Sequence, residues 1–420
     1  MTVIVIANGS VLTPEGWMQT DVAVSGAVIV EIDQVLESAT VIDAAGCLVG
    51  PGFVDLHTHL REPGQTWKED VASGSLSAAA GGFTAVVAMP NTDPPIDSPK
   101  VVDLVASRGV EVGLVDVIPS GALTVGRSGH AVSDIAALYR AGVRVFSDDG
   151  DSVEDSGLLA EIMSTMAALD GAVVAQHAEV SSLTDDGHMH DGAVSRRLGI
   201  GGLAAEAESE IVRRDLDLVR RTGARYHCQH VSAESTVEAI RSAKEEGLPV
   251  TAEVTPHHLS FTEEDLLSLD TNFKMYPPLR SESDRNVLLE ALREGIIDVV
   301  ATDHAPHLPS EKDVAFPEAP RGVIGLETAA SVVWGALAEP DALFKVLSTS
   351  PAGIAGLSDH GQAVKPGNKA NLVVFAPEEV WNVTSFQSKS ANSPYLGADM
   401  TGRVRTTIHD GRVSYQSGEK

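Results

Sequence analysis

The chain of 420 residues lacks any run of about 18 apolar residues, so nothing in it is expected to span a membrane. Only two cysteines are present, Cys47 and Cys228, and both lie in apolar strand-like segments, which predicts reduced thiols rather than a disulfide. The first residues have no charged region followed by an apolar run and a cleavage site, so no signal peptide is expected. Together these absences favour a cytoplasmic globular protein.

Positive charge is also scarce. Thirty Lys and Arg residues stand against 59 Asp and Glu residues, which gives a net charge of −29. A field of this sign repels polyanions, so nucleic acid and anionic membranes are excluded as partners. It also repels an anionic small substrate, which would need local positive charge from a metal ion or an arginine.

Short strand-like segments separated by turn signals occupy both ends of the chain. They are residues 3–7, 11–12, 21–24, 28–32 and 41–43 near the start, and 370–375, 404–409 and 413–415 near the end. Two unrelated strand tails are the alternative, but neither set could bury a core alone. We therefore expect one composite small β-sandwich domain from residues 1–50 and 362–420.

Residues 51–361 alternate apolar strands with helices. Helices are expected at 234–246, capped by Ser232, and from Ser281 and Asp284 to Gly295. The strands show no internal alternation, which indicates a buried parallel sheet, most simply an α/β fold of the (β/α)8 TIM-like barrel type. A doubly wound open sheet is the alternative. The eight strands are expected to end near His57, Met89, Asp116, Asp148, His177, His230, Glu253 and Asp303.

These strand ends carry a surplus of metal-binding side chains. The carboxyl ends of barrel strands form one face, where catalytic groups gather. One catalytic zinc takes three protein ligands and a water, whereas the whole set suits two metals that share a bridging carboxylate. In the segment His57-Thr58-His59 both imidazoles face the same side of a strand, because side chains alternate. The candidates are His57, His59, Asp148, Asp149, His177, His230 and Asp303.

Each candidate alone also has a purely structural interpretation. His177 and His230 could be hydrogen-bonded core histidines, and Asp303 could cap the turn that follows it. Spacing does not decide whether Asp148 or Asp149 points inward. His227 faces the opposite side of its strand from His230 and is therefore interpreted as a non-ligand. The convergence of the whole set is what favours a metal site.

Several segments resemble the amidohydrolase superfamily and, more closely, the bacterial class I dihydroorotases. They are residues 51–64 (PGFVDLHTHLREPG), 88–92, 146–150, 251–259, 277–280 and 301–307, and the resemblance extends over nearly the whole chain. It implies a barrel beside a small β domain. It also implies a site for two Zn²⁺ ions per subunit with the ligands His57, His59, Asp149, His177, His230 and Asp303.

Many relatives, including hydantoinases and allantoinases, bridge their metals with a carboxylated lysine from the fourth strand. This chain has no lysine between Lys100 and Lys244, and the fourth strand offers Arg144 instead. A guanidinium cannot form that carbamate. The resemblance therefore predicts Asp149 as the bridging carboxylate and favours a dihydroorotase over the other cyclic amidohydrolases.

Two positions in the expected substrate pocket depart from the family pattern. Tyr276 stands where the family usually has asparagine, and Arg321 where many members have a smaller or apolar residue. These departures leave the substrate preference open, but they do not affect the expected metal site. The substrate contacts that the resemblance implies are Arg61, Asn91, Tyr276, His307, Arg321 and Gly322.

The implied activity is the reversible cyclisation of N-carbamoyl-L-aspartate to L-dihydroorotate in pyrimidine synthesis. Asp303 is expected to accept a proton from the attacking water and to pass it to the departing ring nitrogen. The alternatives are a hydantoinase- or allantoinase-like enzyme, a one-metal deaminase, and a non-catalytic scaffold for aspartate carbamoyltransferase. The scaffold is disfavoured because all six ligands are retained. A homo-oligomer or a complex with that carbamoyltransferase is left open.

The segment 308–321, which follows Asp303, is long, polar and contains three prolines. It is interpreted either as a lid over the site or as a plain surface excursion.

Overall fold

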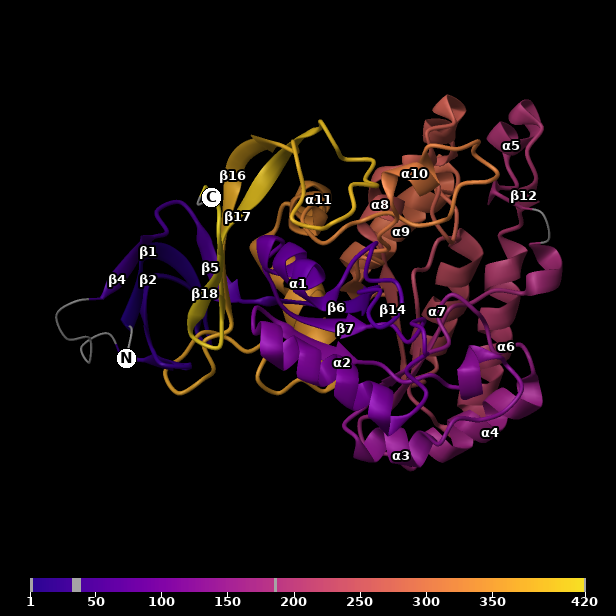
Figure 1. The fold of residues 1–420 in the computed structure, drawn as a ribbon, viewed down its shortest axis with the longest axis horizontal. Coiled ribbons are helices and arrows are strands. Elements are labelled where there is room, and N and C mark those ends of the chain that lie inside the picture. Colours follow the sequence, from indigo (N-terminus) through magenta and orange to yellow (C-terminus); the bar gives the residue numbers. More distant parts are fainter. Residues whose placement is uncertain (1–2, 32–38, 185–186, 419–420) are drawn as a thin grey trace.

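The computed structural model describes residues 3–31, 39–184 and 187–418. A β-sheet lies at one end of the molecule beside a larger body covered by helices, and both chain ends lie on the side of the sheet (Figure 1). Ile32, the last residue of the predicted strand 28–32, lies outside the described residues.

Strands from both ends of the chain form one eight-stranded sheet. Its order is β18-β17-β16-β5-β1-β2-β3, with β4 paired to β1. The two chain ends meet where β5 and β16 pair antiparallel, with Val49 opposite Val374. The strands are β1 (Val3–Thr13), β2 (Gly16–Ser25), β3 (Val28–Val30), β4 (Thr40–Asp43), β5 (Leu48–Pro51), β16 (Leu372–Asn382), β17 (Asp399–His409) and β18 (Arg412–Gln416).

The predicted strands 3–7 and 11–12 form a single strand, β1, with a register shift between Ile6 and Gly9. Before the shift β1 pairs with β4, and after it with β5, so the sheet can enclose its own core. Ile6, Val49 and Val374 are buried in that core. The composite β fold is confirmed, while the domain boundaries at 50/51 and 361/362 stay a prediction.

Eight parallel strands form the barrel. One ladder joins β6-β7-β8 and another joins β15-β14-β13-β10-β9. Parallel bridges between Gly121 and Phe146 and between Thr58 and His304 connect the two ladders and close the ring. The predicted (β/α)8 barrel is confirmed. Its strands are β6 (Phe53–Thr58), β7 (Phe83–Ala88), β8 (Asp116–Pro119), β9 (Val145–Phe146), β10 (Val173–Gln176), β13 (Tyr226–Cys228), β14 (Val250–Val254) and β15 (Val299–Val300).

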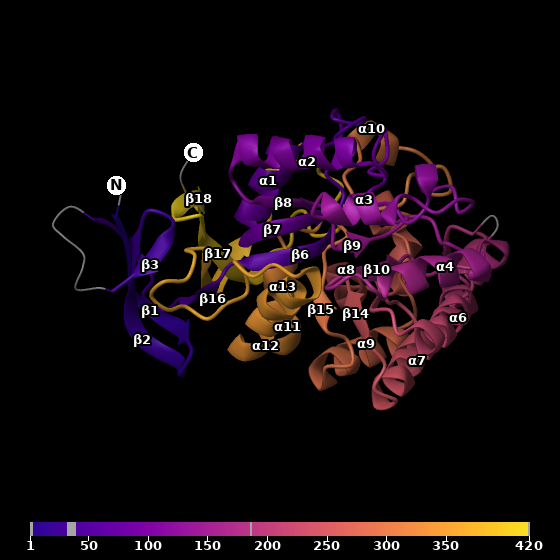
Figure 2. The same cartoon turned by 90° about the horizontal axis from the view of Figure 1, so that it is seen from below.

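Helices surround these strands (Figure 2). The main ones are α1 (Val71–Ala80), α2 (Pro99–Val112), α3 (Ile135–Arg140), α4 (Ser156–Met166), α6 (Glu206–Thr222), α7 (Glu234–Glu245), α9 (Glu282–Glu294) and α11 (Ala329–Leu337). Shorter elements are β11 (Met189–His190), β12 (Gly202–Leu203), α5 (Ala193–Leu198), α8 (Pro256–Ser260), α10 (Pro309–Lys312), α12 (Pro340–Phe344) and α13 (Ser350–Ala355), with a π-helical turn at Lys345–Thr349. Single 3-10 turns lie at Val125–Arg127, Ser181–Leu183, Glu263–Ser268 and Thr271–Phe273.

The capping prediction is right for one helix and wrong for another. Ser281 accepts a hydrogen bond from Asp284 N at the start of α9, and Gly295 ends it in the left-handed conformation. Ser232, in contrast, does not cap α7, because its hydroxyl donates to the buried Glu208 carboxylate.

One strand end was also misplaced. Asp116 begins β8 rather than ending it. Its carboxylate therefore lies at the amino ends of the barrel strands, where it accepts a hydrogen bond from His360 Nε2 at 2.8 Å. Cys47 and Cys228 are both buried and unpaired, as predicted. Within the described ranges, no helix has the length and apolar character needed to cross a membrane.

Candidate active site

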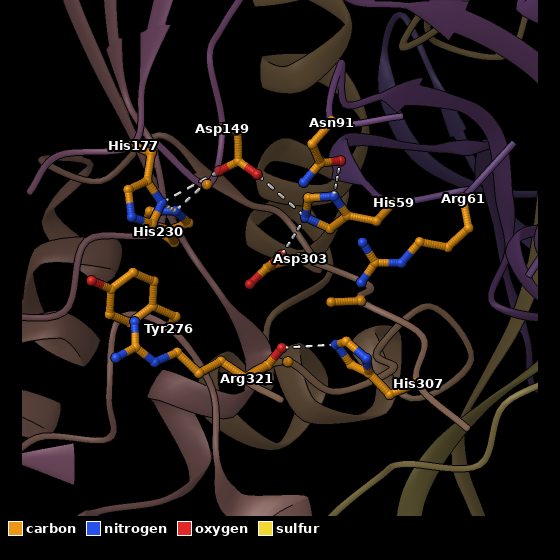
Figure 3. Close-up of a pocket in the computed structure, with 13 residues that line it drawn as sticks. His59, Arg61, Asn91, Asp149, His177, His230, Tyr276, Asp303, His307 and Arg321 are labelled. Atoms are coloured by element: carbon orange, nitrogen blue, oxygen red, sulfur yellow. Dashed lines mark hydrogen bonds and ion pairs between the residues drawn. The ribbon is translucent and has the colours of Figure 1, made fainter. Parts of the chain in front are cut away.

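A cavity of about 190 Å³ opens at the carboxyl ends of the barrel strands (Figure 3). All of the metal ligands and substrate contacts that the resemblance implied line it except His57, which is fully buried and lies behind Asp149. The lining residues are His59, Arg61, Asn91, Asp149, Gly150, His177, His230, Tyr276, Asp303, Ala305, His307, Arg321 and Gly322.

Side-chain atoms that could hold a metal ion form two overlapping groups that share His57. One group contains His57, His59 and Asp303, and the other contains His57, Asp149 and His230, with all atoms of a group within 4.8 Å of one another. His177 adjoins the second group, since its Nδ1 lies 2.8 Å from His230 Nε2. Two cation positions side by side are the arrangement that such a shared set supports.

Asp149 lies between the two groups. Its Oδ1 is 3.2 Å from His57 Nε2, 3.4 Å from His230 Nε2 and 3.5 Å from His177 Nδ1. Its Oδ2 faces the other way and is 3.4 Å from His59 Nε2. A carboxylate whose two oxygens face different ligand groups has the geometry of a bridge.

Asp148 points away from this cluster. Its Oδ1 accepts hydrogen bonds from the backbone N–H groups of Leu123 and Thr124, at 2.8 and 3.1 Å. The structure therefore places Asp149, and not Asp148, among the histidines, which spacing had left undecided. Arg144, directly before β9, also lies outside the cavity, with its guanidinium stacked on Tyr139 at 4.0 Å.

The residues present fit a metal pair. His57 Nε2 and Asp149 Oδ1 are both buried and lie 3.2 Å apart, but among the described residues neither atom makes a hydrogen bond of acceptable geometry, although nearly all buried polar atoms do. Imidazole nitrogen and carboxylate oxygen are ligands that Zn²⁺ prefers. The two atoms therefore fit the role of metal ligands better than that of ordinary core groups.

The electrostatics of the cluster point the same way. Burial alone would raise the pKa of Asp149, but the neighbouring imidazoles of His57, His177 and His230 lower it well below its ordinary value. Burial would lower the pKa of His57, and the carboxylates of Asp149 and Glu253 outweigh it and raise that pKa well above the usual range. Cation binding would displace these protons, because a metal requires the neutral imidazole.

Two side chains behind the cluster orient its histidines. Glu253 on β14 accepts hydrogen bonds from His57 Nδ1 at 2.7 Å and from His227 Nε2 at 3.0 Å. Asn91 Oδ1 accepts one from His59 Nδ1 at 2.9 Å. In His57 and His59 the Nε2 atom is therefore left facing the cluster, which is how partners behind a metal site fix its ligands.

From the sequence, Glu253 was predicted only as a strand end. Its signal was a lone acidic residue in the apolar strand Val250–Val254, where a carboxylate is tolerated only with strong partners. His227, which was interpreted as a non-ligand, lies behind the cluster on this carboxylate.

Three site residues have left-handed backbone conformations. The φ angles are 58° at Arg61, 32° at His230 and 46° at Asp303. Such conformations are unfavourable for residues other than glycine and persist where the surroundings impose them. Asp55 supplies part of this support beside Asp303, because its Oδ1 accepts a hydrogen bond from Thr302 N at 2.8 Å.

Asp303 itself lies at the centre of the cavity (Figure 3). Its Oδ1 is 2.9 Å from His59 Nε2 and 3.6 Å from His57 Nε2. Burial would raise its pKa, but these histidines lower it below the ordinary value of an aspartate. The carboxylate is therefore ionised and able to accept a proton.

Positive charge is placed on the other side of the cavity. Arg61 is held by a hydrogen bond from its Nε to Pro306 O at 3.3 Å. Burial lowers its pKa to about 10, so the guanidinium stays charged at neutral pH. At the same pH the His307 imidazole is uncharged, because burial and the nearby Arg61 and lysine cations lower its pKa to about 2. Its Nε2–H donates to Arg321 O at 2.9 Å.

The two residues that depart from the family pattern contact each other. The Arg321 guanidinium lies 3.9 Å from the centre of the Tyr276 ring and donates to Gly187 O at 2.7 Å. The other side of the Tyr276 ring faces His177, with 5.1 Å between ring centres. Tyr276 thus lies between a candidate metal ligand and a cation, and the pair forms one wall of the cavity (Figure 3).

Gly322, beside this wall, has a φ of 121°. A Cβ atom there would lie 2.7 Å from Ala305 Cβ and 3.3 Å from His307 Nε2, so only glycine fits.

The segment 308–321 is fastened by two buried lysines. Lys274 Nζ donates to the carbonyls of Phe316, Pro317 and Ala319 at 2.7–2.9 Å. Lys312 Nζ donates to Pro320 O at 2.9 Å and also to the carbonyls of Thr271 and Lys274. The segment is therefore tied to the rim of the site, and whether it moves as a lid stays a prediction.

A closed (β/α)8 barrel with a histidine–aspartate cluster at its strand ends and a β-sheet beside it defines a metal-dependent amidohydrolase. A family model described as "Dihydro-orotase-like" matches residues 46–236. A dihydroorotase of Caldanaerobacter subterraneus is 42% identical over 99% of this chain and 98% of the relative, and one of Mycobacterium leprae is 45% identical over 98% of both. The chain belongs to the dihydroorotase family.

Among solved structures, the L-hydantoinase (dihydropyrimidinase) of Arthrobacter aurescens superposes with a TM-score of 0.87. It is 26% identical in sequence, and the match covers 100% of this chain and 97% of the hydantoinase. The expected fold and family are both confirmed.

Proposed function

We propose that this protein catalyses the reversible cyclisation of N-carbamoyl-L-aspartate to L-dihydroorotate through a site for two zinc ions. One observation carries the proposal: the complete histidine–aspartate cluster and the Arg61 guanidinium face one small cavity from different sides. The identity of 42% and 45% to two dihydroorotases, over nearly the full length of the chain, supports the same reaction.

The six ligands named above would hold the metal pair, with Asp149 between the two positions. When bound, the ions would polarise the amide carbonyl and lower the pKa of the attacking water. Arg61 would take the free carboxylate of the substrate and, with Asn91 and His307, orient the reacting carbonyl toward the cluster. This charge also compensates for the negative field of a chain with a net charge of −29.

Asp303 would move the proton. In the hydrolytic direction it accepts a proton from water as the oxygen attacks the ring carbonyl, and it donates that proton to the nitrogen as the C–N bond breaks. In the cyclising direction the ureido nitrogen attacks the carbon of the side-chain carboxyl group in its protonated form, the N–H proton passes to Asp303, and Asp303 returns it to the departing hydroxyl group, which leaves as water. Its ionised carboxylate beside His59 is in the correct state for the first step.

A hydantoin- or allantoin-hydrolysing activity is the alternative. It is included in the test because the wall formed by Tyr276 and Arg321 departs from the family pattern. The purified protein should contain about two zinc equivalents per chain. It should interconvert dihydroorotate and N-carbamoylaspartate in a spectrophotometric assay, with little turnover of hydantoin or allantoin. Fewer than one metal equivalent in active enzyme, or a preference for hydantoin, would overturn the proposal. The cytoplasmic location and an assembly with itself or with aspartate carbamoyltransferase stay predictions.

A further inference from the structure

A segment from the C-terminal part of the chain lies against the barrel face that holds the cavity. Residues 388–395, between β16 and β17, leave the sheet and extend toward the helices of the barrel (the yellow loop near α11 and α8 in Figure 1). We call these residues the strap. From the sequence, these residues were predicted to belong to the small β domain, without a role in the site.

The strap is fastened to the barrel at several points. Ser388 and Lys389 donate hydrogen bonds to the carboxylate of Glu69, which is fully buried. Ser390 Oγ donates to Lys68 O at 2.8 Å. At the other end, the hydroxyl of Tyr395 lies 2.9 Å from Ser260 Oγ. These contacts hold the strap in place without any contribution from Asn392.

Asn392 joins two loops that carry candidate substrate contacts. Its side chain is buried, and its Oδ1 accepts a hydrogen bond from His307 N at 3.0 Å. Its Nδ2 donates to Ala305 O at 3.0 Å and to Gly322 O at 3.1 Å. The backbone carbonyl of Asn392 accepts a further bond from Ile324 N at 3.0 Å. One amide thus ties the loop of His307 to the loop of Gly322.

The position of the His307 ring depends on the distance between these two loops, which the Asn392 amide sets. His307 Nε2–H donates to Arg321 O across the same two loops at 2.9 Å. Gly322 approaches Ala305 and His307 so closely that a side chain would not fit there. Small shifts between the loops would therefore misplace the ring and the adjacent backbone together.

We propose that Asn392 is a positioning residue for substrate recognition: from outside the barrel it fixes His307 and Gly322 at the separation that binding of the substrate carboxylate requires. This inference rests on the proposed function. It assigns Asn392 no contact with the substrate or with the metal ligands, so its loss should change binding of the carboxylate rather than metal content or proton transfer.

The test compares Asn392→Ala with Asn382→Ala in the zinc-loaded enzyme. Asn382 is a matched control, because its exposed side chain donates to Gly397 O and Asp399 of the same C-terminal region, remote from the cavity. For Asn392→Ala we expect KM for dihydroorotate to rise about tenfold, since a lost buried hydrogen-bond partner costs on that order. The kcat should change less than about threefold, and zinc content should be unchanged. Asn382→Ala should match the wild type.

A double variant shows whether Asn392 acts through His307. If it does, His307→Ala combined with Asn392→Ala should be no worse than His307→Ala alone, whereas independent roles would multiply the two effects. Asn392→Asp is the second single variant. It keeps the acceptor for His307 N but turns a carboxylate oxygen toward the carbonyls of Ala305 and Gly322, and it should raise KM at least as much.

The outcomes separate this inference from the proposed function. A zinc-loaded wild-type enzyme without dihydroorotate turnover overturns the function. An active wild type whose Asn392→Ala and Asn392→Asp variants share the kinetics of Asn382→Ala overturns the positioning role alone. If Asn392→Ala does not fold, Asn392→Asp decides, and a fall in its kcat or zinc content with KM unchanged also counts against the role.

Discussion

The two ends of the cavity are built in different ways. At the metal end, the candidate ligands lie at or directly beyond strand ends of one closed barrel, and Glu253 and Asn91 fix the rings of His57 and His59 from behind. At the substrate end, the groups lie on loops, and more distant pieces of chain hold them: the Tyr276–Arg321 stack, the lysines of segment 308–321 and Asn392 of the strap.

This difference has a chemical consequence. Barrel geometry fixes the metal end through backbone hydrogen bonds, so a change there should affect metal binding and turnover together. The substrate end depends on contacts between loops, so its side chains can change while the metals stay in place. The two positions that depart from the family pattern, Tyr276 and Arg321, are both at that end.

Replacing Asp303 by Asn should have the largest effect on the metal end. The amide cannot accept the proton of the attacking water, so we expect kcat to fall by about 10³-fold, within the range known for acid–base groups. Steady-state rates in both directions measure this, with zinc content determined on the same samples. Near wild-type turnover with full zinc would show that Asp303 is not the proton carrier.

Replacing Glu253 by Gln should affect the metal end less strongly. His57 loses the carboxylate that orients its ring, and we expect metal affinity to fall by about 10- to 100-fold. Competition with a chelator measures this. Asp215→Asn is the matched control, because Asp215 is equally buried but accepts a hydrogen bond from Tyr226 instead of a candidate ligand. Equal zinc loss in both variants would mean that Glu253 acts only through stability.

Substituting the stacked pair should change the substrate end alone. For Tyr276→Asn and Arg321→Ala we expect KM for dihydroorotate to change by about tenfold, because each loses a cation–π contact and the wall it supports. The double variant should resemble the single ones, since both remove the same contact. Tyr276→Phe keeps the ring and should remain close to the wild type.

Full additivity of the two single effects would show that Tyr276 and Arg321 act separately. A loss of zinc from Tyr276→Asn would show that the ring supports His177, and the division between the two ends of the cavity would then not hold at this point.

The two ends of the cavity could be predicted from the sequence to different extents, because they are built differently. Strand periodicity and the common edge of a parallel barrel were enough to bring His57, His59, His177, His230 and Asp303 together. Spacing could not separate Asp148 from Asp149, because β9 has only two residues and both aspartates lie in the turn beyond it. The resemblance selected Asp149, and the geometry places that residue among the histidines.

The contacts that support the site were mostly beyond prediction. The bond between Asn392 and His307 joins residues 85 positions apart through a loop without periodicity. Ser232 has the sequence signature of a helix cap, yet the buried Glu208 carboxylate competes successfully for its hydroxyl. Tertiary partners of this kind override local signals.

Replacing Lys312 by Met should have the smallest effect on the enzyme, because it changes contacts only at the rim of the site. Three carbonyls, including that of Pro320, lose a donor, and we expect the segment 308–321 to be cleaved faster by mild protease. The free energy of unfolding should fall by about 1–3 kcal/mol. Lys369→Met is the control, because Lys369 forms only an exposed ion pair with Asp410. Slower cleavage in the presence of dihydroorotate would identify the segment as a lid.

The same variant has a pH signature. Burial and the neighbouring Lys274 cation lower the pKa of Lys312 to about 7 in the folded protein, against about 10.4 for a free lysine. Between these values the unfolded chain binds more protons than the folded one, so this lysine makes stability rise with pH. Urea denaturation at about pH 7 and pH 9 should therefore show a smaller increase for Lys312→Met than for wild type and Lys369→Met. Equal increases would mean that the three carbonyls keep Lys312 protonated across this range.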